Sequence, residues 1–199
     1  CEDPKFIKSL TIEALSLEGF LFPDTYHFHK GETPERIIQT MVTEYQKLLD
    51  GMLKSRLQIR GLTELEMVTL ASIIEGEAIY DSERSLISSV YHNRLAKEMR
   101  LQADPTIQYI IEDGPRRLLK NDLTIKSPYN TYRHYGLPPG PINSPGRESL
   151  ISALSPADAD YLFFVANGEG YHTFSRTETE HNVAKKKFQR LRRQMRNKK

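Results

Sequence analysis

The stretch Thr63-Glu-Leu-Glu-Met-Val-Thr-Leu-Ala-Ser-Ile-Ile-Glu75-Gly-Glu-Ala78 decides how this chain folds. Thr63 followed three residues later by Glu66 is a capping-box sequence, which predicts that a helix begins here. Apolar side chains then recur every three or four residues, so one face of the helix is expected to be turned towards the core. The side chains on that face are those of Met67, Leu70, Ala71, Ile74 and Ala78.

Glu75 is expected at the edge of this apolar face. Its neighbours one helical turn away are Ala71, Ser72, Ala78 and Ile79, none of which could neutralise a carboxylate. Poor solvation favours the protonated form, and a protonated carboxylic acid near neutral pH is suited to acid catalysis on a sugar bond. The alternative is a boundary glutamate that reaches water and has no catalytic role.

Size and composition indicate an ordinary globular chain. It has 199 residues, of which 38% are apolar and 27% charged, with no low-complexity segment and no apolar run of transmembrane length. A net charge of +2 indicates neither a nucleic-acid nor a membrane partner. The acid-free run from Lys185 to Lys199 is expected to be the solvated end of a terminal helix. The single cysteine, Cys1, excludes an internal disulfide and a cysteine metal cluster.

The first residue suggests that this sequence is part of a longer protein. The sequence opens on Cys1, without an initiator methionine or a signal peptide, as an excised or processed piece of a longer protein would. A lipid-bearing N-terminal cysteine is the alternative explanation.

The fold class follows from the order of the expected elements. Thr33-Pro34 and Asp81-Ser82 are predicted to begin helices before and after the Glu75 helix. A strand over residues 161–166, a turn and a partner strand over residues 171–174 form a predicted hairpin, and a terminal helix follows from Thr177. We therefore predict an α+β domain in which the helices carrying Glu75 and Asn93 pack on a small antiparallel sheet.

Three other features have both a structural and a functional interpretation. Asp104 before Pro105 is a typical helix N-cap, and His172 is expected as a core-edge histidine on its strand. The stretch 129–146, rich in tyrosine, proline and glycine, is either a rigid loop on which sugars stack or a well-tied connector. His27 and His29 lack a third ligand, so no metal site is predicted.

Ten short segments then occur in a fixed order between residues 18 and 182. They are Glu18–Thr25, Ala71–Glu75, Asn93–Leu95, Met99–Thr106, Tyr129–Thr131, Gly136–Gly140, Ser144–Gly146, Tyr161–Ala166, His172–Phe174 and His181–Asn182. No single segment is diagnostic, but together they resemble the YceG-like family, the MltG-type endolytic murein transglycosylases of bacteria. The resemblance covers nearly the whole chain.

The resemblance implies a cell-wall enzyme anchored in the inner (plasma) membrane by one N-terminal helix. That helix and a LysM-like subdomain would be missing here, so residues 1–17 are interpreted as a connector and residues 18–199 as the catalytic domain facing the periplasm or cell exterior. The implied partners are peptidoglycan glycan strands, with peptidoglycan synthases as possible partners of the full-length protein. No cofactor is implied.

The implied reaction is non-hydrolytic cleavage between N-acetylmuramic acid and N-acetylglucosamine, which leaves a 1,6-anhydromuramoyl end and limits strand length. In the family the glutamate closing the Ala71–Glu75 motif is the acid/base, so the resemblance assigns Glu75 as catalytic. The muramic acid C6 hydroxyl would be the nucleophile, and a second carboxylate is then unnecessary. By motif position, the predicted cleft-lining residues are Asn93, Gln102, Asp104, Tyr129, Asn130, Tyr132 and His172.

The two residues that follow Glu75, Gly76 and Glu77, both bear on its assignment as the catalytic acid. Gly76 stands where many other lytic transglycosylases have serine, and it is expected to end or loosen the helix beside an open rim. Glu77 competes for the acid role. Its spacing from Asp81 favours a solvated or capping residue. Loss of cleavage in Glu77→Gln with full activity in Glu75→Gln would contradict the Glu75 assignment.

Three other functions remain as alternatives. A non-catalytic peptidoglycan-binding module would bind glycan without an anhydro product, and a two-carboxylate hydrolase using Glu75 and Asp104 would add water. The label aminodeoxychorismate lyase, attached to relatives of the family, fits least, because the sequence has no glycine-rich phosphate loop and no context for a Schiff-base lysine.

Overall fold

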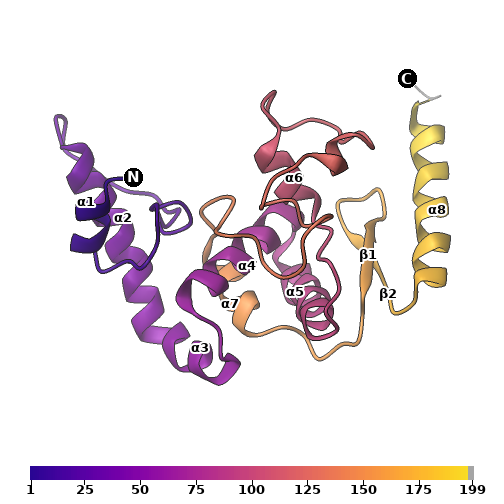
Figure 1. The fold of residues 1–199 in the computed structure, drawn as a ribbon, viewed down its shortest axis with the longest axis horizontal. Coiled ribbons are helices and arrows are strands. Elements are labelled where there is room, and N and C mark those ends of the chain that lie inside the picture. Colours follow the sequence, from indigo (N-terminus) through magenta and orange to yellow (C-terminus); the bar gives the residue numbers. More distant parts are fainter. Residues whose placement is uncertain (197–199) are drawn as a thin grey trace.

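The computed structural model describes residues 1–196 and confirms the α+β class (Figure 1). A two-stranded antiparallel sheet is the only sheet in this part of the chain, and helices make up the rest of the regular structure. The helices are α1 (Pro4–Ser9), α2 (Pro34–Leu48), the π-helical η1 (Leu49–Leu53), α3 (Lys54–Arg60), α4 (Glu64–Glu77), α5 (Asp81–Ala96), α6 (Asp104–Ile110), the short 3-10 helix η2 (Asp122–Thr124), α7 (Arg147–Leu154) and α8 (Glu178–Arg196).

Helix α4 is the central element of the fold. The predicted capping box is present: the Thr63 hydroxyl accepts from the Glu66 N–H, and the Glu66 carboxylate accepts from the Thr63 N–H. Every residue from Met67 to Ile74 is buried, so the expectation of one inward face is wrong. Helices α5, α6 and α7 all pack against α4, and a helix enclosed on several sides needs no polar stripe.

The N-terminal helices pack at the other end of the core. Thr33 caps α2 as predicted, and Phe20 lies edge-on against the ring of Tyr45 on α2, with centroids 5.4 Å apart. Ile7 and Leu17 are buried in the same apolar cluster. The division between a connector and a catalytic domain at residue 17 stays a prediction.

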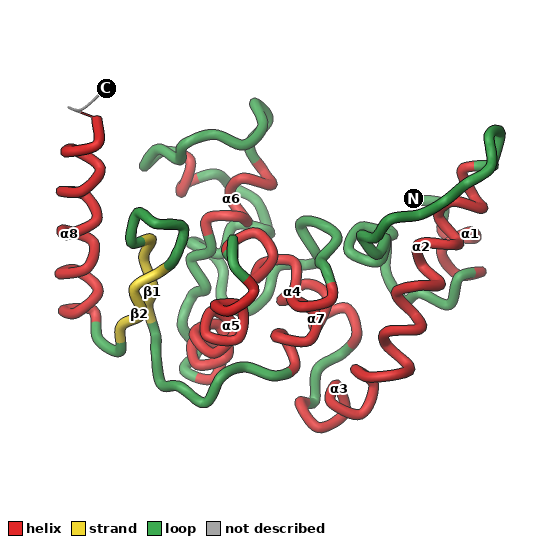
Figure 2. Tube along the Cα trace, turned by 180° about the vertical axis from the view of Figure 1, so that it is seen from behind, coloured by secondary structure: helices red, strands yellow, loops and turns green. Residues whose placement is uncertain are grey.

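The hairpin lies on the opposite side of α5 from this region (Figures 1 and 2). Strand β1 (Phe163–Ala166) pairs with β2 (His172–Ser175), with Phe164 opposite Phe174. The ring of Phe164 lies edge-on against Tyr91 of α5, and Phe163 stacks on His181 of α8. The sheet thus packs on α5, as predicted for the Asn93 helix, whereas α4 packs mainly on other helices.

No helix in the described part of the chain combines the length and apolar character that crossing a bilayer requires.

Candidate functional site

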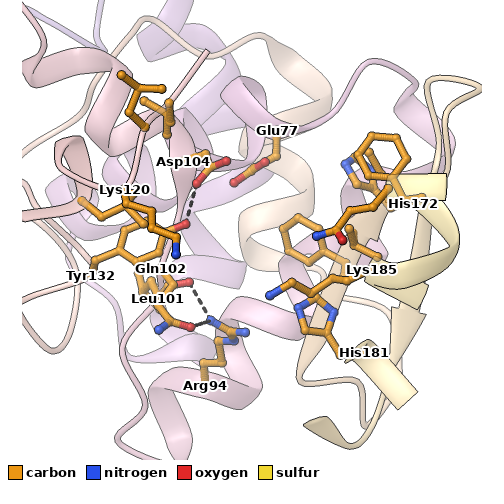
Figure 3. Close-up of a pocket in the computed structure, with 18 residues that line it drawn as sticks. Glu77, Arg94, Leu101, Gln102, Asp104, Lys120, Tyr132, His172, His181 and Lys185 are labelled. Atoms are coloured by element: carbon orange, nitrogen blue, oxygen red, sulfur yellow. Dashed lines mark hydrogen bonds between the residues drawn. The ribbon is translucent and has the colours of Figure 1, made fainter. Parts of the chain in front are cut away.

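A hollow of about 690 Å³ is here called the main cavity. Helices α4, α5 and α6, the loop before η2, the hairpin and the start of α8 supply its lining (Figure 3). A second hollow of about 530 Å³, the side cavity, lies against α4 and α6. Glu77 and Asp104 line both cavities, so these two carboxyl groups stand where the hollows meet.

Glu77 is the last residue of α4 and points into the main cavity (Figure 3). One of its carboxyl oxygens accepts a hydrogen bond of 2.9 Å from the hydroxyl of Tyr91, which is buried on α5. Burial raises the pKa of Glu77 to about 7, and the charge of Asp104 acts in the same direction, while Tyr91 and Arg94 oppose the shift. At neutral pH this carboxyl group is therefore present in both its acid and its base form.

Asp104 is the first residue of α6, and its carboxylate accepts a hydrogen bond of 2.5 Å from the Tyr132 hydroxyl. Ala103 occupies the N-cap position, and its side chain makes no capping bond, so the expectation that Asp104 caps this helix is wrong. The Asp104 side chain is directed to the cavity instead, beside Glu77 (Figure 3).

Glu75 lies in a different environment from the one predicted. One of its carboxylate oxygens accepts hydrogen bonds from Arg84 at 3.1 Å and from the Gly146 N–H at 3.2 Å, and the other lies 3.5 Å from the same guanidinium. No Lys or Arg lies one turn away on α4, as predicted, but Arg84 from α5 supplies a counter-ion. Glu75 lines neither cavity and links α4 to α5 and to the start of α7.

The helix also continues through Gly76, contrary to the expected break. A Cβ atom at Gly76 would lie 2.7 Å from Cβ of Pro105, which is closer than real Cβ contacts. Glycine is thus required here so that α4 can approach α6, and this approach brings Glu77 close to Asp104.

Replacing Gly76 by alanine is therefore expected to lower the free energy of unfolding by about 1–3 kcal/mol, despite the higher helix propensity of alanine. It should also lower any activity that needs Glu77 and Asp104 together. Gly51→Ala is the matched control, because nothing lies within 4 Å of a Cβ at that helical position. Urea unfolding of both variants measures the effect, and equal stability changes would contradict the role of Gly76.

The raised pKa of Glu77 predicts that the free energy of unfolding depends on pH. Its pKa is raised from 4.5 to about 7 on folding, so its contribution is complete below pH 4.5 and is lost as the pH rises through 7. Glu77→Gln removes this loss, because glutamine does not titrate and its carbonyl still accepts from Tyr91. We expect the variant to gain on the order of 3 kcal/mol over the wild type between pH 4.5 and pH 8.5. Urea unfolding across this range tests it, and a pH-independent difference would contradict it.

His172 lies at the hairpin end of the main cavity. Its backbone N–H and its ring Nδ1 each lie 2.9 Å from a carboxylate oxygen of Glu83, which is buried on α5. This two-point contact fixes the ring orientation. Gln102, Asp104, Tyr132 and His172 are thus the predicted cleft residues that the structure brings into the main cavity.

The other three predicted cleft residues lie elsewhere. The Asn93 amide donates to the carbonyl oxygens of Ala159 and Tyr161, and it holds the segment before β1 on α5. Asn130 is fully buried, and its amide donates to two carbonyl oxygens of the 123–125 segment. Tyr129 packs against Tyr109 on another part of the surface. Asn93, Asn130 and Tyr129 therefore do not line the main cavity, and their contact with sugars stays a prediction.

Basic side chains also line the main cavity, which the sequence did not indicate. Arg94, Lys120, His181 and Lys185 line the main cavity (Figure 3). Lys185 belongs to the run that was expected to be solvated, and only the fold of α8 onto the hairpin directs it here. Within residues 1–196, no three His, Cys, Asp or Glu side chains are placed to hold a metal ion.

Comparison with known proteins then decides the family. The model of the YceG-like family matches residues 3–187. This chain belongs to the YceG-like family. A Bacillus subtilis (strain 168) relative, named endolytic murein transglycosylase, is 43% identical over 173 residues, which make up 86% of this chain and 48% of that protein. A Streptococcus pneumoniae (strain R6) relative of the same name is 34% identical over 91% of this chain and 35% of its own length.

A solved structure has the same fold. The crystal structure of a YceG-like protein from Listeria monocytogenes is 38% identical, with a TM-score of 0.81 over 92% of this chain and 64% of that one. The present YceG-like chain spans about half or less of the length of the two named relatives.

Proposed function

We propose that this YceG-like domain is the catalytic part of an endolytic murein transglycosylase, with Glu77 as its acid and base. The observation that carries the proposal is the place of Glu77, which is partly buried between two cavities that it lines together with Asp104. An enzyme that cuts inside a polymer must hold sugars on both sides of the cleaved bond, and two hollows meeting at one acid provide that space. The names of the relatives support the same activity.

Glu77 first donates its proton to the glycosidic oxygen between N-acetylmuramic acid and N-acetylglucosamine. The bond from the anomeric carbon to that oxygen breaks, and the leaving N-acetylglucosamine keeps the proton as its C4 hydroxyl. Glu77, now a carboxylate, takes the proton of the muramic acid C6 hydroxyl while that oxygen bonds to the anomeric carbon. The products are a 1,6-anhydromuramoyl end and a regenerated acid, with no water consumed.

The neighbours of Glu77 support this double use of one group. Tyr91 holds one carboxyl oxygen, and Asp104 disfavours a second negative charge nearby. Asp104 in turn accepts the Tyr132 hydroxyl, which keeps its carboxylate in place. We propose that Asp104, Tyr132, Gln102 and His172 contact the sugars and that Glu75 has a structural role.

The pH dependence of kcat/KM follows from the pKa of the acid. Because Glu77 must be protonated to start the reaction and has a pKa of about 7, we expect kcat/KM to fall about tenfold per pH unit at higher pH. Initial rates on glycan strands between pH 5 and pH 9 measure this limb. A rate that is constant from pH 7 to pH 9 would exclude Glu77 as the acid.

Endolytic cleavage is tested with uncrosslinked glycan strands of defined length. Chromatography of the digest should show fragments from the middle of the strands at early times. A peptidoglycan-binding module would retain the strands uncut, and an enzyme acting from the ends would release only disaccharide units.

The surroundings of this domain are also part of the proposal. We propose that it is held in the plasma membrane by a segment outside residues 1–199, and that it works beside peptidoglycan synthases to limit strand length.

A further inference from the structure

Three cationic groups from separate elements line the main cavity. Arg94 comes from α5, Lys120 from the loop before η2, and Lys185 from α8. Figure 3 shows the ammonium groups of Lys120 and Lys185 directed into the cavity from opposite walls. Among the described residues, neither lysine lies within 4 Å of a carboxylate.

Arg94 is held rigidly with part of its hydrogen-bonding capacity unused. Its Nε donates to the Leu162 carbonyl at 2.6 Å, and its Nη1 donates to the carbonyl of Leu101 at 2.8 Å. These bonds fix the guanidinium, while Nη2 has no partner within hydrogen-bonding distance in the described part of the chain. An arginine that is buried, oriented and incompletely paired is ready to bind a planar anion.

His181 adds an independent sign of a missing ligand. Its Nδ1 is buried and has no hydrogen-bond partner in the part of the chain that is described, and its ring stacks on Phe163. Burial and the charges of Lys185 and Arg94 lower the pKa of His181. An anion placed among these groups would offset their mutual repulsion.

We propose that Arg94, Lys120 and Lys185 form a subsite that binds a carboxylate carried by the muramic acid of the substrate. This inference rests on the proposed function, because it takes the main cavity to be the glycan cleft. Muramic acid carries either a stem peptide with free carboxylates or, where the peptide is absent, a free lactyl carboxylate. Both are planar anions one short linker away from the sugar, and the subsite would favour muramic acid over neutral sugars on this side of Glu77.

The test uses a ligand that cannot be cleaved. The disaccharide-peptide GlcNAc–MurNAc-peptide contains no MurNAc–GlcNAc bond, so its binding to the wild-type chain can be titrated whether or not the domain is an enzyme. Two further probes separate the sources of the carboxylate: GlcNAc–MurNAc, which keeps only the lactyl group, and neutral chitobiose.

We expect Lys185→Gln and Lys120→Gln to weaken binding of the disaccharide-peptide by roughly tenfold each. Lys186→Gln is the control, because Lys186 is exposed on the same helix and does not line the cavity. Weakening for the disaccharide-peptide alone would identify the stem peptide as the source of the anion. Equal weakening for GlcNAc–MurNAc would show that the subsite also accepts the free lactyl carboxylate. Chitobiose binding should not change.

Three results would overturn the subsite: no saturable binding of either charged probe to the wild type, unchanged binding in both cavity variants, or an equal effect of Lys186→Gln. Failure of the proposed function has a different outcome, namely intact glycan strands together with lysine-dependent binding of the charged disaccharides.

Discussion

Replacing Glu77 by glutamine is expected to lower the rate of glycan cleavage by roughly 10²–10⁴-fold. Glutamine still accepts the hydrogen bond from Tyr91 and fills the same space, but it has no proton to donate and cannot accept one from the C6 hydroxyl. Initial rates on uncrosslinked strands measure the effect. Because the substitution should not destabilise the domain at neutral pH, unfolding in urea distinguishes lost chemistry from lost structure.

Glu75→Gln is the matched control, two residues away on the same helix. Its side chain faces Arg84 and the N–H of Gly146, away from both cavities, so cleavage should continue at a rate close to that of the wild type. The opposite pattern, with activity lost in Glu75→Gln and retained in Glu77→Gln, would restore Glu75 as the acid.

Replacing Arg84 by methionine is expected to lower the free energy of unfolding by about 2–4 kcal/mol. The guanidinium is nearly buried and contacts Glu75 on α4, Asp81 on α5 and the buried hydroxyl of Ser149 on α7. Its removal leaves Ser149 without this donor and Glu75 without its counter-ion. Asp81 is largely exposed and contributes little to this loss.

The corresponding fall in Tm is roughly 5–10 °C, which a thermal unfolding scan detects easily. Arg56→Met is the control, since Arg56 donates to Ser155 from an exposed position and should change the unfolding free energy by less than about 1 kcal/mol. A double-mutant cycle of Arg84→Met with Glu75→Gln isolates the ion pair. Additive effects would show that Glu75 and Arg84 stabilise the domain independently.

Local sequence patterns predicted much of the fold. The capping box at Thr63, the Thr33 cap of α2 and the hairpin after residue 161 depend on residues close together in the chain, and all three are present. The ordered motifs also led to the correct family. Such features need no knowledge of tertiary contacts.

The choice between Glu75 and Glu77 could not be made in this way. Residues two positions apart on a helix point about 200° away from each other. Glu75 and Glu77 must therefore face different neighbours. Which of the two faces the cavity depends on Arg84 and Tyr91 of α5 and on Asp104 at the start of α6. None of these three residues lies one helical turn away from Glu75 or Glu77 along α4.

Asn93 and Asn130 illustrate the same limit. Their motif positions suggested sugar contacts, but their amides donate to partly buried backbone carbonyls, which come close only once the loops are folded. Conversely, Lys185 belongs to a basic run that is typical of a solvated helix end. It enters the cavity only because α8 packs on the hairpin.

The measurement that tests the proposed chemistry most directly is mass spectrometry of strands cleaved in water enriched in ¹⁸O. We predict new muramoyl ends that lack one water relative to a reducing sugar and carry no ¹⁸O, because the C6 oxygen of the same sugar closes on the anomeric carbon. These ends should be absent from the Glu77→Gln digest. Reducing ends that contain ¹⁸O would instead show that water attacks the anomeric carbon, and the domain would then be a hydrolase.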